Sequence, residues 1–295
     1  MQRQSQTPPL VTPVGNVKHL RMQGSLLYKR STAQHLTLVS VKGEVKELPY
    51  ERVAEAFGVE NHPHLLHALE EGEPVLRRRV LESLSSTLKL PQELVMYIKH
   101  GVVELLEGGI ICGVDGEEAP YANQLSDSDR ELQELSALAL SAIAESPCGQ
   151  AELLKGETIT RIKPVFASAA NKRTTEYLYN TLLHLSSSFP GARQLTAAGY
   201  LPIILEQLKG PRQNDALRLR ALQLLKNLVN DGVGPTTYRS LELGAVPQCS
   251  KRLFSPNFEV RVAACDALMA LGFAEKARKA VVEHEGVVQR LCDGS

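Results

Sequence analysis

Six glycines recur at nearly even intervals along this chain of 295 residues, and each stands directly before an apolar segment. The spacings are 43, 55, 43, 45 and 42 residues, and the glycines are Gly58, Gly101, Gly156, Gly199, Gly244 and Gly286. A period of about 40–47 residues is typical of helical solenoids, in which each repeat is a small group of helices stacked on the next. The spacing therefore predicts a stack of helical repeats, a type of structure that usually binds other macromolecules along an extended surface.

The composition favours a folded, all-α protein. Hydrophobic residues make up 43% of the chain and charged residues 22%, which is typical of globular proteins. Aromatic residues make up only 5% and Trp is absent, so an interior of Leu, Ala and Val suits helix-on-helix packing. The net charge is zero, so no overall basic field attracts nucleic acid or an anionic membrane. No stretch approaches the ~20 uninterrupted apolar residues of a membrane span.

The cysteines indicate a reducing, cytoplasmic compartment. The five cysteines lie far apart and form no CxxC pair, so neither a disulfide framework nor a zinc site is expected. They are Cys112, Cys148, Cys249, Cys265 and Cys292. Cys265 lies inside an apolar run and is interpreted as a small buried residue. The first residues also lack the apolar core of a secretory signal.

The sequence divides into three parts. Residues 1–48 do not share the repeat, and their Pro-rich start predicts an extended or partly disordered arm. Within this arm, residues 35–48 alternate around Lys42-Gly43 and are compatible with a short hairpin. Residues 49–290 form the predicted solenoid of about five repeats, and residues 291–295 form a tail.

The one long spacing predicts an insertion in the second repeat. Residues 108–127 are rich in Gly and acidic residues, and we expect them to form a loop on one face of the solenoid. The fourth repeat is regular. Its last helix has apolar residues at Leu217, Ala221 and Leu224, which continue through Leu228, so this helix is expected to lie between two neighbours.

Two segments of the chain resemble armadillo repeats. In the fourth repeat, Leu201–Leu208 is followed by Ala216–Leu228, and in the fifth, Gly244–Pro247 is followed by Asn257–Leu271. Matching repeats cover about residues 50–290. The resemblance implies a right-handed superhelical solenoid of the armadillo or HEAT type that binds protein partners.

A narrower resemblance lies near the start of the solenoid. The segments Glu55–Gly58, His64–Leu69, Pro74–Leu84 and Gly101–Leu106 are similar to the opening repeats of the armadillo protein of axonemal radial spokes. This similarity implies a structural subunit in the axoneme of motile cilia and flagella, with other spoke proteins as partners. The long arm and the insertion depart from the pattern of that family.

One row of residues on the last helices of the repeats is expected to line a concave groove. Its members share one position in the Leu pattern, and they are Arg79, Glu82, Leu135, Leu138, Tyr177, Asn180, His184, Arg220, Gln223 and Asn227. The row predicts a partner-binding groove, because Tyr and Arg are frequent interface anchors. The alternative is a solvated edge with a locally covered patch at Leu135 and Leu138. Nuclear-signal binding is not expected, because relatives with that function carry repeated groove Trp residues.

The C-terminal end is a second candidate interface. After Gly286 the sequence offers only a short apolar segment, and solenoid ends without a polar cap leave apolar surface in water. The residues concerned are Phe273, Val281, Val287 and Val288. We interpret this end as a docking surface, with self-association as the alternative.

Other clusters favour ordinary structural roles. Arg77–Arg79 is suited to an acidic partner, although a solvated helix face with Glu–Arg pairs is the simpler interpretation. Of the three histidines near residue 64, Pro63 is expected to leave only His64 and His67 on one helix, so no metal site is predicted.

No catalytic or phosphate-binding motif is present, and the sequence predicts no catalytic residue, cofactor or small-molecule substrate. The prediction is a non-catalytic structural scaffold, with a radial-spoke subunit as its most specific form. The alternative is a soluble adaptor that binds extended or helical peptides in transport or signalling. An enzyme is the least favoured class.

Overall fold

A computed structural model describes residues 37–39, 45–47, 61–111, 127–210, 214–230 and 234–283 of the chain. The chain divides into two compact units, Met1–Val80 and Leu81–Ser295. The boundary lies inside helix α3 (Pro74–Thr87), which therefore contributes a half to each unit. None of the described helices is both long enough and apolar enough to span a membrane.

The first unit contains a short sheet and helix α2 (Asn61–Glu71). Strands β1 (Thr37–Val39) and β2 (Val45–Glu47) pair antiparallel, with Val39 opposite Val45, inside the segment whose alternation is compatible with a hairpin. The other residues of the predicted 1–48 arm lie outside the described residues. The arm itself therefore stays a prediction.

Helix α2 corrects one expectation. The helix includes His62, Pro63, His64 and His67, so Pro63 does not separate His62 from the other two histidines. Pro is tolerated here because the first turn of a helix has backbone N–H groups without intrahelical partners.

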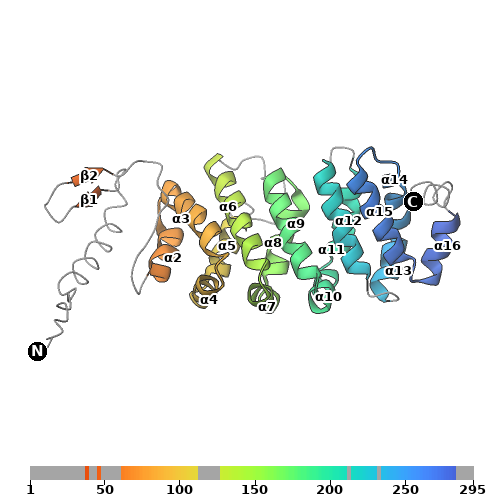
Figure 1. Ribbon diagram of the computed structural model, residues 1–295, viewed down its shortest axis with the longest axis horizontal. Coiled ribbons are helices and arrows are strands. Elements are labelled where there is room, and N and C mark those ends of the chain that lie inside the picture. Colours follow the sequence, from red (N-terminus) through yellow and green to blue (C-terminus); the bar gives the residue numbers. More distant parts are fainter. Residues whose placement is uncertain are drawn as a thin grey trace, which may run out of the picture. The chain divides into compact units, whose positions relative to one another are not determined.

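The second unit is a succession of three-helix repeats (Figure 1). In each repeat a short first helix and a second helix precede a longer last helix, and the last helices α6, α9, α12 and α15 pack side by side in that order. The helices are α4 (Pro91–Lys99), α5 (Val102–Ile111), α6 (Asp127–Ala144), α7 (Pro147–Lys155), α8 (Thr158–Ser168), α9 (Lys172–Ser186), α10 (Phe189–Ala197), α11 (Tyr200–Lys209), α12 (Asp215–Val229), α13 (Pro235–Glu242), α14 (Ala245–Arg252), α15 (Phe258–Leu271) and α16 (Glu275–Glu283).

Three of the recurring glycines form the turn between the first and second helix of a repeat, while Gly58 and Gly286 lie outside the described residues. Gly101, Gly199 and Gly244 have φ values of 80°, 78° and 81°, in the left-handed region that favours glycine. Each directly precedes a second helix. Gly156 is extended instead, because Glu157 adds one residue before α8 begins. Among the four glycines that the structure describes, the sequence period therefore reflects one repeated backbone geometry, from which Gly156 departs.

Asparagines begin three of the last helices. Asn171, Asn214 and Asn257 are each the N-cap of their helix, and each side-chain oxygen accepts a hydrogen bond from the backbone N–H two residues later. Asn is among the preferred N-cap residues because its side chain satisfies an otherwise unpaired backbone donor. These caps are 43 residues apart. Residues of α9, α12 and α15 that are 43 apart in the sequence therefore occupy equivalent positions in their helices.

The predicted insertion is shorter than the sequence suggested. Helix α5 continues to Ile111 and α6 begins at Asp127, so residues 108–111 are helical and the insertion does not start at Gly108. Ile110 in this last turn is buried and continues the buried face that Val103 and Leu106 form earlier in the helix. A side chain at Gly109 would overlap Ser136 on α6, so glycine permits the close packing of α5 against α6. Residues 112–126 lie outside the described residues.

Buried polar contacts connect successive repeats. Glu107 on α5 is almost fully buried, and its carboxylate accepts hydrogen bonds from the Thr158 hydroxyl and, at 3.0 Å, from Arg161 Nη1. Both donors lie on α8. A buried carboxylate is stable only with such partners, so this contact fixes the position of the third repeat against the second.

Candidate functional site

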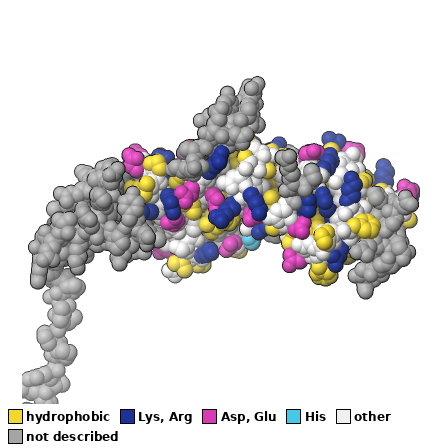
Figure 2. All heavy atoms as spheres, turned by 90° about the horizontal axis from the view of Figure 1, so that it is seen from above, with side chains coloured by type: hydrophobic (Ala, Val, Ile, Leu, Met, Phe, Trp, Pro, Cys, Tyr) yellow, Lys and Arg dark blue, Asp and Glu magenta, His cyan; other side chains and the backbone are white. Residues whose placement is uncertain are grey.

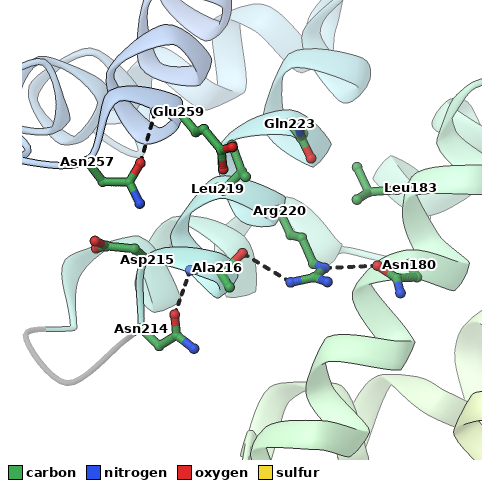
Figure 3. Close-up of a pocket in the computed structure, with 10 residues that line it drawn as sticks. All are labelled: Asn180, Leu183, Asn214, Asp215, Ala216, Leu219, Arg220, Gln223, Asn257 and Glu259. Carbon is green, nitrogen blue, oxygen red and sulfur yellow. Dashed lines mark hydrogen bonds between the residues drawn. The ribbon is translucent and has the colours of Figure 1, made fainter.

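An open hollow of about 650 Å³ lies between the C-terminal half of α9 and the N-terminal parts of α12 and α15. Ten residues from three successive repeats line it, and Figure 3 draws them all. They are Asn180, Leu183, Asn214, Asp215, Ala216, Leu219, Arg220, Gln223, Asn257 and Glu259.

Arg220 forms the wall of the hollow between α12 and α9. Its Nε donates to Asn180 Oδ1 at 2.9 Å, and its Nη1 donates to the carbonyl oxygen of Ala216 at 3.4 Å (Figure 3). These bonds hold the long side chain in one orientation across the gap between the two helices. Arg220 is thus a fixed part of the surface, which lowers the conformational entropy lost when a partner binds.

Primary amides surround the hollow on three repeats. Asn214 Oδ1 accepts from Ala216 N at 2.6 Å, and Asn257 Oδ1 accepts from Glu259 N at 2.9 Å. Each of these caps also carries an NH₂ group, and the exposed Gln223 carries both an amide oxygen and an NH₂ group. Because an amide can donate and accept at once, this lining matches the alternating N–H and C=O groups of an extended peptide backbone.

Charges of both signs lie at the same hollow. Asp215 Oδ1 accepts from Arg218 Nη1 at 2.9 Å, while Glu259 is exposed on α15. On the face that Figure 2 shows, basic and acidic side chains of the described residues are likewise intermixed. The hollow therefore offers both hydrogen-bond donors and acceptors, and neither positive nor negative charge dominates its lining.

The structure brings together part of the predicted groove row. Asn180, Arg220 and Gln223 all line the hollow. Asn227 instead donates from Nδ2 to Ser186 Oγ at 2.9 Å, so it joins α12 to α9. Tyr177 and His184 are half-buried on α9, as Leu135 and Leu138 are on α6, and none of these four lines the hollow.

The row is not tested at its first repeat. Arg79 and Glu82 are both half-buried on α3, but Arg79 belongs to the first compact unit and Glu82 to the second. Of the predicted C-terminal docking residues, Phe273 is exposed and Val281 is half-buried, whereas Val287 and Val288 lie outside the described residues.

Sequence reasoning missed the capping asparagines. Asn214 and Asn257 precede their helices and so fall outside a row defined by the Leu pattern within each helix. A usable signal was present, because Asn recurs every 43 residues at positions 171, 214 and 257, each directly before a last helix.

Two observations concern the metal-ligating and thiol groups of the described residues. Among its residues no three His, Cys, Asp or Glu side chains lie close enough to hold a metal ion. Full burial raises the pKa of the Cys249 thiol to about 12, so this thiol stays protonated near neutral pH.

Three designed proteins illustrate what this chain is similar to. A structure described as an engineered protein is 19% identical, with a TM-score of 0.64 over 79% of this chain and 87% of that chain. A computationally designed armadillo repeat protein for modular peptide recognition is 15% identical, with a TM-score of 0.64 over 78% and 90%. A designed armadillo repeat protein in complex with the peptide (KR)4 is 14% identical, with a TM-score of 0.58 over 88% and 95%.

These similarities show an armadillo-type solenoid fold. The identities are low, so the fold alone is shared with these proteins. No protein-family model and no curated protein matches the sequence.

Proposed function

We propose that this protein is a non-catalytic scaffold that binds an extended segment of a partner protein in the hollow on α9, α12 and α15. The observation that carries the proposal is the set of amide side chains that three successive repeats present around one open hollow. Such amides recognise a backbone whatever its sequence, and Arg220 and Glu259 add contacts to side chains of either charge.

Two of the similar structures support this proposal. One is described as designed for modular peptide recognition, and another was solved in complex with the peptide (KR)4. Both share the solenoid fold, although neither is close in sequence. The lining residues of this chain supply the independent argument, because most of them are polar, and hydrogen bonds hold Asn180, Arg220 and the two capping asparagines in place.

A display library of random peptides tests the proposal. Peptides selected on the full chain are expected to bind one to one. Gln223→Ala and Asn180→Ala are each expected to lower the affinity for these peptides about fivefold to tenfold, because one lost hydrogen bond is worth about 1 kcal/mol. Isothermal titration calorimetry measures the change. Gln194→Ala, which removes an exposed amide on α10, is the matched control and is expected to leave the affinity unchanged.

Two outcomes would contradict this function. Selection that yields no one-to-one binder would remove the peptide-binding role. Peptides that bind the wild type and the Gln223→Ala and Asn180→Ala variants with equal affinity would place binding outside the hollow.

As a more specific role, we propose a structural subunit of the radial spoke in the axoneme of cilia and flagella, with other spoke proteins as partners. Its support is the resemblance of the segments between Glu55 and Leu106 to the opening repeats of the armadillo protein of radial spokes. This role predicts that the tagged protein in a ciliated cell stays with the axoneme after detergent extraction. Recovery only in the detergent-soluble fraction would exclude it, and would leave a soluble peptide-binding adaptor as the remaining form of the scaffold.

A further inference from the structure

Helix α15 and the turn after it carry a stripe of uncovered apolar side chains. Phe258, Val262 and Met269 are 68%, 42% and 69% exposed, and Phe273 is 63% exposed. Cys265, which the sequence suggested would be buried, lies on the same stripe and is partly exposed. The spacing i, i+4, i+7, i+11 places the helical members on one face of α15. These five residues are the α15 stripe.

The centre of the corresponding face is covered elsewhere in the stack, whereas Asp215 and Leu219, which occupy the positions of Phe258 and Val262 on α12, line the open hollow. Tyr179 on α9 and Leu222 on α12 occupy the register position of Cys265, 43 residues apart, and both are fully buried. At the position of Met269, α12 carries Lys226, whose Nζ donates to Asp266 Oδ2 on α15 at 2.7 Å. This face of a last helix is therefore where the stack continues.

The opposite face of α15 already has its neighbour. Ala263, Ala264 and Ala267 are buried, and α15 packs closely against α12. The small side chains let the two helices approach each other. The α15 stripe points away from that contact, and no helix among the described residues covers it.

We propose that the α15 stripe is a dimer interface, in which α15 of a second copy of this chain packs antiparallel against it. The order of side chains is aromatic, apolar, Cys, apolar and aromatic, and the pairs Phe258/Phe273 and Val262/Met269 share one midpoint, between residues 265 and 266. An isologous two-fold contact requires such self-complementarity. In this pairing Phe258 lies opposite Phe273, Val262 lies opposite Met269, and the two Cys265 side chains lie beside the two-fold axis.

The charges that flank the stripe suit this pairing. Asp266 is neutralised by Lys226 within the same chain. Arg261 Nη1 donates to the carbonyl oxygens of Ser255 and Pro256 at 3.0 Å, and its guanidinium lies 5.5 Å from the centre of the Phe258 ring. In this pairing the charge of Asp266 is compensated by Lys226, and the Arg261 guanidinium is hydrogen-bonded to backbone carbonyl oxygens and lies against the Phe258 ring.

The size of the stripe predicts a weak dimer. A helix of 14 residues is about 21 Å long. Its single face is small compared with the roughly 800 Å² that each partner buries in a standard stable interface. We therefore expect a dissociation constant on the order of 10 µM, with monomer and dimer in rapid exchange.

Sedimentation velocity across a wide range of protein concentration tests the dimer. The wild type is expected to shift from monomer to dimer as concentration rises, and Phe258→Glu is expected to remain monomeric. Phe189→Glu is the matched control, since Phe189 is also the first residue of its helix and is also 68% exposed. Because both side chains are exposed, circular dichroism should show unchanged helicity in both variants.

Thiol cross-linking tests the register. A short bismaleimide is expected to join two wild-type chains, and Cys265→Ser should abolish this product while Cys148→Ser should not. Without Cys265, a chain with Phe258→Cys should cross-link to a chain with Phe273→Cys more readily than to another Phe258→Cys chain. This second comparison separates the antiparallel pair from a parallel one.

Two results would overturn the proposal. One is a wild-type chain that stays monomeric at every concentration, which would leave the stripe to another protein or to another part of the chain. The other is a dimer that Phe258→Glu does not weaken. The dimer does not depend on peptide binding in the hollow, so Met269→Glu, a substitution on the stripe away from the lining residues Asn257 and Glu259, should weaken the dimer and retain the affinity of selected peptides.

Discussion

At the scale of single residues, some helical glycines are required by close packing and others are not. Gly149 and Gly191 lie in the first turn of α7 and α10, and the side chains of Ser146 and Ser188 accept hydrogen bonds from their backbone N–H groups. A Cβ atom at Gly191 would overlap the carbonyl oxygen of Leu185, so close approach of the backbone requires glycine there. At Gly108 on α5 a Cβ atom would meet nothing within 4 Å.

This difference predicts opposite effects of one substitution. Gly191→Ala is expected to lower the free energy of unfolding by about 1–3 kcal/mol, because the added methyl group forces the backbone of α10 away from Leu185. Gly108→Ala is expected to raise it by up to about 1 kcal/mol, because Ala has the higher helix propensity. Urea denaturation followed by circular dichroism measures both changes.

The two glycine variants control for each other. Both add one methyl group to a helical glycine, so their difference isolates the contact at Leu185. Equal stability of the two variants would mean that α10 moves freely relative to α9, contrary to the packing described above.

At the scale of helices, buried aromatic side chains connect repeats three and four. Phe166 on α8 lies with its ring centre 4.8 Å from that of Tyr179 on α9 and 5.4 Å from that of Tyr200 on α11. Tyr200 Oη donates to the carbonyl oxygen of Ile159 at 2.6 Å, and Tyr179 Oη donates to Gln207 Oε1. Burial raises the pKa of both tyrosines above the ordinary value.

These tyrosines predict a loss of stability in alkali. Their folded-state pKa lies above the unfolded value of about 10, so their contribution is complete below about pH 10 and is lost as pH rises toward the folded pKa. Tyr200→Phe is expected to lower the free energy of unfolding by about 1 kcal/mol at neutral pH, since the Ile159 carbonyl loses its donor. The same variant is expected to lose less stability than the wild type above about pH 10.

Urea denaturation at a series of pH values measures this effect. Tyr238→Phe changes a tyrosine that is 37% exposed, and it is the control because its hydroxyl is not buried. A Tyr200→Phe variant whose stability falls with pH as steeply as that of the wild type would contradict the argument.

At the scale of the whole second unit, stability is expected to differ between repeats. Helix α12 has seven buried residues and lies between α9 and α15, whereas α16 has one buried residue, Ala277. In a solenoid the stability is approximately a sum of repeat terms and contacts between neighbours, so the helices with fewest neighbours open most easily.

Hydrogen exchange measured by mass spectrometry tests this expectation. Peptides from α12 are expected to be the most protected of the second unit, and peptides from α16 are expected to exchange fastest among its described helices. Protection of α16 that equals that of α12 would show that the unit opens only as a whole. If α16 becomes protected as protein concentration rises, the change should disappear in Phe258→Glu.

Much of the fold followed from the sequence. The glycine period arises from a turn that recurs in the second, fourth and fifth repeats, and the Leu patterns of the last helices arise from burial between neighbours, so the sequence shows both. The predicted insertion began too early, because two glycines suggested a loop where the packing of α5 on α6 keeps them in a helix. Pro63 was likewise interpreted as a break, although the first turn of α2 accommodates it.

The candidate sites depended on the tertiary structure. Asn180, Arg220 and Gln223 were predicted from position in the repeat, but the contact between Arg220 and Asn180 joins residues 40 apart, and no periodicity shows which side chains meet. The same holds for the α15 stripe. Phe258 and Met269 are exposed while nearby apolar residues such as Val260 and Leu268 are buried, and the sequence alone does not distinguish the two groups. The sequence determined the repeat and its period because those depend on local backbone geometry. Only the tertiary structure decided which faces are covered, because burial depends on contacts between distant residues.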